Sequence, residues 1–234
     1  VVSPWWSVGR LGCMAGGKRS DRLSARDVEV LGFIARFGLV PREAVAIWAG
    51  TARSVTLARE RRLRRAGLIE VGSEFWGAER MVAPTVAGLR LSGYRHLGPA
   101  RISGAGAVHE AAVARLAARL ERGGARLLSE REALAHERAE ERRVYSLKVE
   151  EGRRLHRCDL IADAGEDSPP EAIEVELSVK GAARLDRILR SWRRAIAEGR
   201  FAAVAYHCSP RALGAVRRAV ERTSTGSYVR VEEL

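Results

Sequence analysis

The alternation of aliphatic and acidic residues in Ala172–Leu177 constrains the fold more than any other feature of this sequence. Successive side chains of a β-strand point to opposite faces, so Ile173, Val175 and Leu177 share one face. Glu174 and Glu176 share the other face. Burying two unpaired carboxylates in the middle of a sheet is costly, and we therefore expect a cation or water beside them.

The segments around this strand predict a mixed sheet flanked by helices. Apolar residues at helical spacing predict a helix over Val108–Glu121, and Arg126–Glu130 has the character of a strand. The remaining predicted elements alternate between strands and helices after a first pair of strands: Cys158–Ala162, Ala172–Leu177, Lys180–Glu198, Phe201–His207, Pro210–Arg222 and Tyr228–Val231. This order is typical of an α+β fold. Residues 133–154 are highly charged and left open, a helix followed by a hairpin arm being one interpretation.

Asp159 lies on the predicted strand that precedes the acidic one, so its carboxylate and those of Glu174 and Glu176 are candidates for a shared site. Oxygen-rich sites of this kind suit Mg²⁺ or Mn²⁺. Such an ion would polarise a phosphodiester and activate a water molecule for attack. Lys180, a turn later, is a candidate for orienting that water or stabilising the developing charge. The alternative is that the two glutamates face solvent or pair with arginines of the following helix.

The N-terminal half has the pattern of three helices followed by a two-stranded hairpin. Ser24 is a suitable N-cap for the first helix, and Gly38, Gly50 and Gly67 suit the ends of the three helices in turn. The predicted segments are helices Ala25–Phe37, Pro41–Trp48 and 51–66 (from Thr51 or Ser54), strands Leu68–Val71 and Met81–Ala83, and a further helix Thr85–Leu91. This order predicts a winged helix-turn-helix.

The third predicted helix carries the strongest indication of DNA binding. Its apolar residues are predicted to face the core: Val55, Ala58, Leu63 and Ala66. The other faces suit the major groove, where arginine bonds guanine edges and Ser or Thr contacts phosphates or bases. The candidate DNA contacts on this helix and the wing are Arg53, Ser54, Thr56, Arg61, Arg64 and Arg80. A solvated helical face and a protein-binding winged helix are the alternatives.

The net charge of +12 is concentrated in this N-terminal half. Residues 1–107 hold 17 Lys and Arg against 8 Asp and Glu, whereas residues 108–234 hold 24 against 21. An excess concentrated in one half is typical of a surface that binds polyanions. Only three of the 41 basic residues are lysine, so a GC-rich genome is a competing explanation for part of the arginine content.

Asp159, the Glu174-Val175-Glu176 strand and Lys180 together resemble the PD-(D/E)xK nuclease superfamily. With the winged helix they are similar to the replication-relaxation family of plasmid and mobile-element proteins, and the blocks that carry this resemblance are 108–113, 129–131 and 173–180. The resemblance implies a Mg²⁺ or Mn²⁺ cofactor with Glu110, Asp159 and either Glu174 or Glu176 as ligands. The superfamily places lysine two residues after the acidic ligand, where this chain has Glu176, so the resemblance leaves catalysis open.

We therefore predict an α/β (α+β) chain in three parts. A Gly/Ser/Ala-rich bridge, 103–107, is predicted to link the second part to the third. Residues 1–23 are predicted to be a disordered or misassigned N-terminus, with Val1–Cys13 upstream of a natural start at Met14. Residues 24–102 are predicted to form a winged helix-turn-helix, and residues 108–234 a PD-(D/E)xK nuclease-like domain. The predicted function is binding of double-stranded DNA in plasmid or mobile-element replication or transfer, with Mg²⁺-dependent endonuclease activity and a homodimer as open questions. The alternative is a non-enzymatic regulator whose C-terminal domain dimerises or clamps DNA.

Several other classes of protein and site are not indicated by the sequence. Three cysteines imply no disulfide framework and fit a reducing cytoplasm. No window holds the ~18 uninterrupted apolar residues of a membrane span, and no small-molecule cofactor is implied. The spacings around His156–Cys158 and His207–Cys208 match no usual zinc site. His109 is interpreted as a cap or packing residue, and Gly104–Gly106 lacks the rest of a phosphate-binding fingerprint.

Overall fold

The computed structural model describes residues 23–72, 80–100, 104–149, 155–165 and 168–234. Within these ranges helices and strands are mixed along the chain, which confirms the predicted α+β class. The predicted N-terminal segment 1–23, except for its last residue, lies outside the described residues.

The N-terminal half combines helices with a small antiparallel sheet. Its elements are α1 (Ala25–Phe37), β1 (Val40–Pro41), α2 (Arg42–Ala49), α3 (Arg53–Arg65), β2 (Ile69–Val71), β3 (Met81–Pro84), α4 (Val86–Leu91) and the 3₁₀ helix η1 (Arg95–Leu97). The strand order is β1-β3-β2, and both pairs are antiparallel. The predicted helices and wing strands occur in the predicted order, but β1 and η1 were not predicted. Helix α3 starts at Arg53, and its N-cap residue, Ala52, makes no side-chain cap.

Local sequence signals set the ends of α1 and α2. Ser24 and Asp27 form a capping box, in which the backbone N–H of each residue donates to the side chain of the other. Gly38 ends α1 with a φ of +77°, and Gly50 ends α2 with a φ of +63°. Side chains other than glycine rarely adopt such angles, so these two glycines are required by the turns they make.

The C-terminal half is built on a five-stranded mixed sheet. Its elements are α5 (Gly104–Arg122), β4 (Leu127–Ser129), α6 (Glu130–Ala139), β5 (Leu147–Lys148), β6 (Leu155–His156), β7 (Leu160–Ala162), β8 (Glu171–Glu176), α7 (Ala182–Ala197), β9 (Ala203–Cys208), α8 (Pro210–Thr223) and β10 (Val229–Glu233). The strand order is β10-β9-β8-β7-β4, in which β8, β9 and β10 are parallel and β7 and β4 antiparallel to their neighbours. Most of α6 and β5 lie in the stretch that the sequence left open, whereas β6 follows it directly. Glu130, predicted to end a strand, is the first residue of α6.

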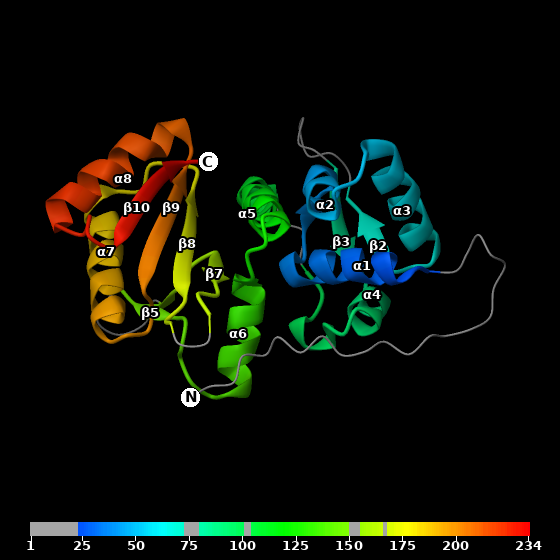
Figure 1. The fold of residues 1–234 in the computed structure, drawn as a ribbon, viewed down its shortest axis with the longest axis horizontal. Coiled ribbons are helices and arrows are strands. Elements are labelled where there is room, and N and C mark those ends of the chain that lie inside the picture. Colours follow the sequence, from blue (N-terminus) through cyan, green and yellow to red (C-terminus); the bar gives the residue numbers. More distant parts are fainter. Residues whose placement is uncertain (1–22, 73–79, 101–103, 150–154, 166–167) are drawn as a thin grey trace.

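Helices cover both faces of this sheet. On one face, Ile173 and Val175 of β8 pack against α5, and on the other Ala172 packs against α7 and α8. Figure 1 shows α7 and α8 at one end of the molecule, the sheet beside them, then α5, and the helical N-terminal half at the opposite end. Helix α5 therefore stands between the sheet and the N-terminal helices.

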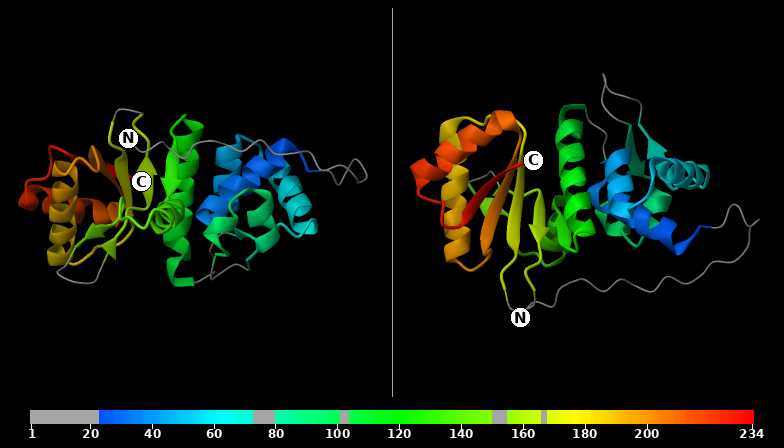
Figure 2. Two further views of the ribbon diagram at one scale, coloured as in Figure 1. Left: turned by 90° about the horizontal axis from the view of Figure 1, so that it is seen from below. Right: turned by 45° about the horizontal axis from the view of Figure 1, so that its top comes forward.

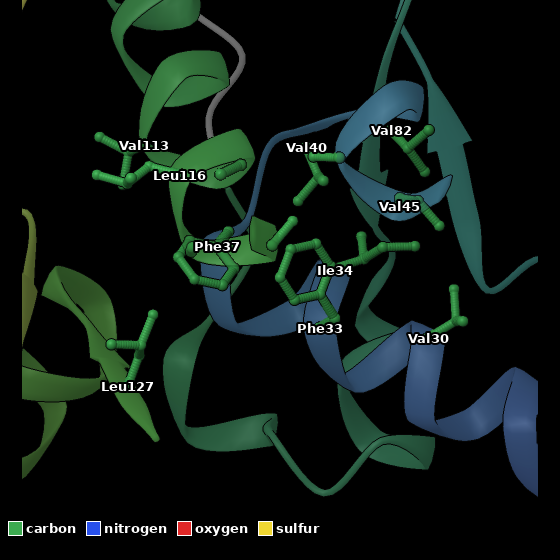
Figure 3. Packing of buried hydrophobic residues seen from close by; sticks show 14 of the residues in the cluster. Val30, Phe33, Ile34, Phe37, Val40, Val45, Val82, Val113, Leu116 and Leu127 are labelled. Carbon is green, nitrogen blue, oxygen red and sulfur yellow. The ribbon is translucent and has the colours of Figure 1, made fainter. Parts of the chain in front are cut away.

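One hydrophobic core runs through α5 and joins the two halves. It contains Phe33 and Phe37 of α1, Val113 and Leu116 of α5, and Leu127 of β4 (Figure 3). The predicted bridge between the halves is therefore wrong for Gly104–Ala107, which form the first turn of α5. Ala107 is buried in a hydrophobic cluster, whereas a residue of a linker would be exposed.

A separate core lies between the sheet and its outer helices. Its largest side chains are Trp192 of α7, Tyr206 of β9 and Phe201, all fully buried. Trp192 and Phe201 meet edge to face with ring centroids 5.1 Å apart, a favourable aromatic geometry. This core fixes α7 and α8 on the sheet. In the part of the chain that is described, none of the helices has both the length and the apolar character needed to cross a bilayer.

Candidate functional site

The outward face of α3 is the first candidate site. Thr56 and Leu63 are the buried residues of α3, and they set the side of the helix that faces the core. Ser54, Ala58, Arg61 and Arg65 recur at spacings of four and three residues, which places them on one exposed face. Arg53 and Arg64 are exposed beside this face. The outward face of α3 therefore has small residues towards its N-terminus and arginines towards its C-terminus.

A buried aspartate sorts the arginines of α3 into two groups. Asp27 of α1 is fully buried and accepts hydrogen bonds from Arg59 Nε at 3.0 Å and from Arg62 Nη2 at 2.6 Å. Glu60 pairs with Arg42, whose Nε lies 2.5 Å from Glu60 Oε2. The other arginines of α3 have no ion-pair partner among the described residues: Arg53, Arg61, Arg64 and Arg65. Their charge is available to a partner outside the chain.

Two predictions about α3 are corrected by this arrangement. Thr56, predicted to contact DNA, is only 2 % exposed, and its hydroxyl donates to the carbonyl oxygen of Ala52 at 3.3 Å. Val55, predicted to face the core, is 47 % exposed, and Ala58 and Ala66 are exposed too. The physical reason is that the ion pairs with Asp27, together with the burial of Thr56 and Leu63, fix which side of α3 faces the core. The spacing of apolar residues alone does not show this side.

The predicted wing is described only in part. Arg80 is exposed directly before β3, and its carbonyl oxygen accepts a hydrogen bond from the N–H of Arg42 at 3.3 Å. Residues 73–79, the turn-rich part of the predicted wing, lie outside the described residues. Arg80 thus lies at the base of the β2–β3 connection, adjoining the start of α2.

Asp159 is the second candidate site, and it lies directly before β7. Its Oδ2 accepts the backbone N–H of Val175 at 2.7 Å, which ties it to β8. Its Oδ1 lies 2.8 Å from Nε2 of His109, which projects from α5. This hydrogen bond raises the pKa of His109, and the charge of Asp159 adds to the effect. Asp159 is therefore held between β8 and α5.

Glu174 and Glu176 project from the face of β8 that α7 covers, and both are buried. Oε1 of Glu174 lies 2.5 Å from Nε2 of His156 on β6. Oε2 of Glu176 lies 2.5 Å from Nζ of Lys180, in the segment between β8 and α7. The predicted alternative of a solvent-facing pair is wrong, because both glutamates are buried, each beside a basic side chain.

The three carboxylates share one electrostatic environment. Burial raises the pKa of Glu130, and the charges of Asp159 and Glu174 raise it further. Burial alone would lower the pKa of His156, but the Glu174 carboxylate outweighs it and the net shift is upward. The two histidines and Lys180 therefore lie beside the carboxylates at this end of β7 and β8.

Glu110 has a different position from the one that the resemblance implies. Burial raises its pKa, and the charged groups that act on it are Arg131 and His109. Arg131 itself donates to the carbonyl oxygens of Ala35 and Gly98, which lie in the N-terminal half. The α5 side chain that contacts Asp159 is therefore His109, and Glu110 is oriented towards the junction of the halves.

The carboxylates are chemically suited to Mg²⁺ or Mn²⁺, and in the described structure each of them has a protein partner. Asp159 is bonded to His109 and to the backbone N–H of Val175. The partner of Glu174 is His156, and that of Glu176 is Lys180. Within the described ranges, no three His, Cys, Asp or Glu side chains converge closely enough to hold a metal ion. As described, these residues stabilise one another.

Comparisons of the chain with protein-family models, with curated proteins and with solved structures gave no match. The resemblance to the replication-relaxation family stays a prediction from sequence. The function is therefore argued below from the geometry of the two candidate sites.

Sequence reasoning missed three residues of the carboxylate site: His109, His156 and Glu130. His109 meets Asp159 across 50 positions of the chain, so no local spacing indicates the contact. His156 was considered only in connection with zinc, yet it is the partner of Glu174. The one available signal was the cost of burying Glu174, which requires a cationic or donor group nearby.

Proposed function

We propose that this protein binds double-stranded DNA through its N-terminal half, which acts as a winged helix-turn-helix. Helix α3 would enter the major groove, and the β2–β3 connection would act as the wing. The order of the helices and the antiparallel β1-β3-β2 sheet support this assignment. Arg53, Ser54, Arg61 and Arg64 are accessible for DNA contacts, Arg80 is exposed at the base of the wing, and Arg65 is added to the set.

The observation that carries the proposal is the sorting of arginines by Asp27. Acidic residues three or four positions away on the same helix would balance its arginines. Glu60 is the acidic residue of α3, and it is paired with Arg42. The arginines of α3 that have no ion-pair partner among the described residues are therefore exposed, and they can meet phosphates and guanine edges.

Replacing Arg61 and Arg65 together by alanine is expected to weaken duplex binding by about 100-fold, since an arginine contact contributes roughly 1–3 kcal/mol. The measurement is fluorescence anisotropy with a short labelled duplex over a series of salt concentrations. Arg138→Ala, on the exposed end of α6, is the single-charge control and should change the affinity little. Equal affinity of the α3 variant and the unsubstituted protein would disprove docking through α3.

A second candidate function is Mg²⁺-dependent DNA cleavage by the C-terminal half, acting as a PD-(D/E)xK nuclease-like domain. The observation that favours it is the gathering of Asp159, Glu174, Glu176 and Lys180 at one end of β7 and β8. The separate ion pairs of these residues disfavour it. On this balance, the non-enzymatic alternative, in which the C-terminal half dimerises or clamps DNA, fits the described geometry better.

Supercoiled plasmid incubated with the protein in Mg²⁺, and in EDTA as the control, is expected to stay uncut if the ion pairs are structural. Metal-dependent nicking that disappears in Asp159→Ala would instead establish the nuclease function. Nicking that persists in that variant would show that Asp159 has no part in cleavage. The proposed setting, replication or transfer of a plasmid or mobile element, is supported by the sequence resemblance alone.

A further inference from the structure

The outer surface of α7 and α8 is densely cationic, although the C-terminal half as a whole is nearly balanced in charge. Both helices pack on the same sheet face through their apolar sides, so their polar sides form the outer surface of the molecule. The exposed arginines on this surface are Arg184, Arg187, Arg190, Arg193, Arg194, Arg211, Arg217, Arg218 and Arg222. We call this surface the α7–α8 arginine face.

Few acidic groups compensate this charge. The two helices contain only Asp186 and Glu221 as acidic residues, and Asp186 is paired with Arg222 at 2.7 Å. Arg190, Arg194 and Arg218 have no ion-pair partner in the described part of the chain. Along α7, Arg184 to Arg194 span roughly 15 Å at ~1.5 Å per residue, a length comparable with several phosphates of a duplex.

A general bias towards arginine does not explain this face. Helix α6 and the residues after it are also exposed, yet there Arg138, Arg142 and Arg143 alternate with Glu140 and Glu141. The same chain therefore balances its charges on one surface and leaves them unbalanced on another. The imbalance is a property of the α7–α8 arginine face.

We propose that the α7–α8 arginine face is a second binding surface for the phosphate backbone of duplex DNA, separate from α3. Arginine forks match phosphate oxygens, and a row of them on a helix follows the charge of the backbone. Figure 1 and both views of Figure 2 place α3 and the α7–α8 pair at opposite ends of the long axis. One molecule would thus hold two duplex segments at once.

The composition of the face favours a nucleic acid over a membrane surface. A helix that lies in a lipid interface needs large apolar side chains such as Trp, Phe or Leu that can enter the bilayer. The large apolar residues exposed in the described structure are Val55, Val86, Val108, Val179 and Leu234, and none of them is on α7 or α8. The face has charge for phosphates without apolar groups for insertion.

The test is capture of a second duplex. A duplex is fixed to beads, protein is added, and retention of a labelled second duplex is measured. The variant Arg190→Ala/Arg194→Ala/Arg218→Ala should lower capture by about 10-fold or more, because each lost phosphate contact reduces the slope of log affinity against log salt by ~0.9. Alanine suits exposed helix positions, so the variant should fold, and circular dichroism checks this.

The matched control is Arg138→Ala/Arg142→Ala/Arg143→Ala, which removes the same charge from another surface and should keep full capture. Capture by the α7–α8 variant equal to that of the unsubstituted protein would overturn the inference, as would equal losses in variant and control. Binding to phosphatidylglycerol vesicles that the variant loses, with duplex capture unchanged, would assign the face to membranes. Failure of the α3 proposal would appear separately, as unchanged binding by Arg61→Ala/Arg65→Ala.

Discussion

Replacing Arg36 by alanine should lower the free energy of unfolding by about 3–5 kcal/mol, the usual cost of removing one partner from a buried ion pair. Arg36 lies on α1, and its Nη1 is 2.7 Å from Oε1 of Glu121 on α5. Its Nε is 3.0 Å from Oε2 of Glu132 on α6, and its Nη2 donates to the carbonyl oxygen of Leu127. All three charged side chains are nearly buried.

The large cost follows because one substitution leaves two buried carboxylates without their cation. Glu121 would keep one hydrogen bond, from Nε1 of Trp48 at 2.7 Å, and Glu132 would keep its capping-box bonds with Ser129. Chemical denaturation followed by circular dichroism is the measurement. Arg230→Ala, which breaks an exposed pair with Glu171, is the control and should cost at most about 1 kcal/mol. Equal losses in the two variants would contradict the importance assigned to the Arg36 junction.

Asp27→Asn is expected to destabilise the fold by about 3 kcal/mol near neutral pH, because Arg59 and Arg62 lose their buried anion. Burial alone would raise the pKa of Asp27, but hydrogen bonds from Arg62, Ser24 and Arg59 outweigh burial and lower the pKa from 3.8 to about 2. The shift corresponds to about 2 kcal/mol of stability that is present above pH 4.

The sign of this effect sets its pH dependence. Since the pKa is lower in the folded state, the stabilisation by Asp27 is complete above the unfolded pKa and is lost as the pH falls towards 2. The difference in stability between the unsubstituted protein and Asp27→Asn should therefore shrink between pH 5 and pH 2. Thermal unfolding at several pH values measures it, with Asp186→Asn at an exposed pair as the control. A difference that stays constant over this range would show that Asp27 does not titrate as described.

Most elements were predicted in their correct order because their signals are local, but β1 and η1 were not predicted. The alternation in Ala172–Leu177 predicted β8, and the glycines at 38 and 50 predicted the ends of α1 and α2. The start of α7 was placed two residues early at Lys180, which instead precedes the helix and pairs with Glu176. Local patterns thus gave the elements to within a few residues.

Contacts between distant residues were the part that the sequence could not supply. The phase of α3 depends on Asp27, which is more than 30 positions away from Arg59 and Arg62 and is polar, so apolar spacing did not reveal it. The same is true of His109, which was interpreted as a packing residue and lies against Asp159. For the carboxylate site, the sequence identified the three acidic residues and Lys180. It did not identify His109 and His156, the partners of Asp159 and Glu174.

Helix α5 is shared by the two halves, because one continuous hydrophobic core contains residues of the N-terminal helices, of α5 and of the sheet. Neither half can be replaced by a domain from another protein through simple fusion, because the new domain would have to pack against a surface of α5 that fits the original half. Recombination within such a protein has to preserve the helix together with both of its contact surfaces. The orientation of α3 relative to the arginines of α7 and α8 is thus inherited as one unit.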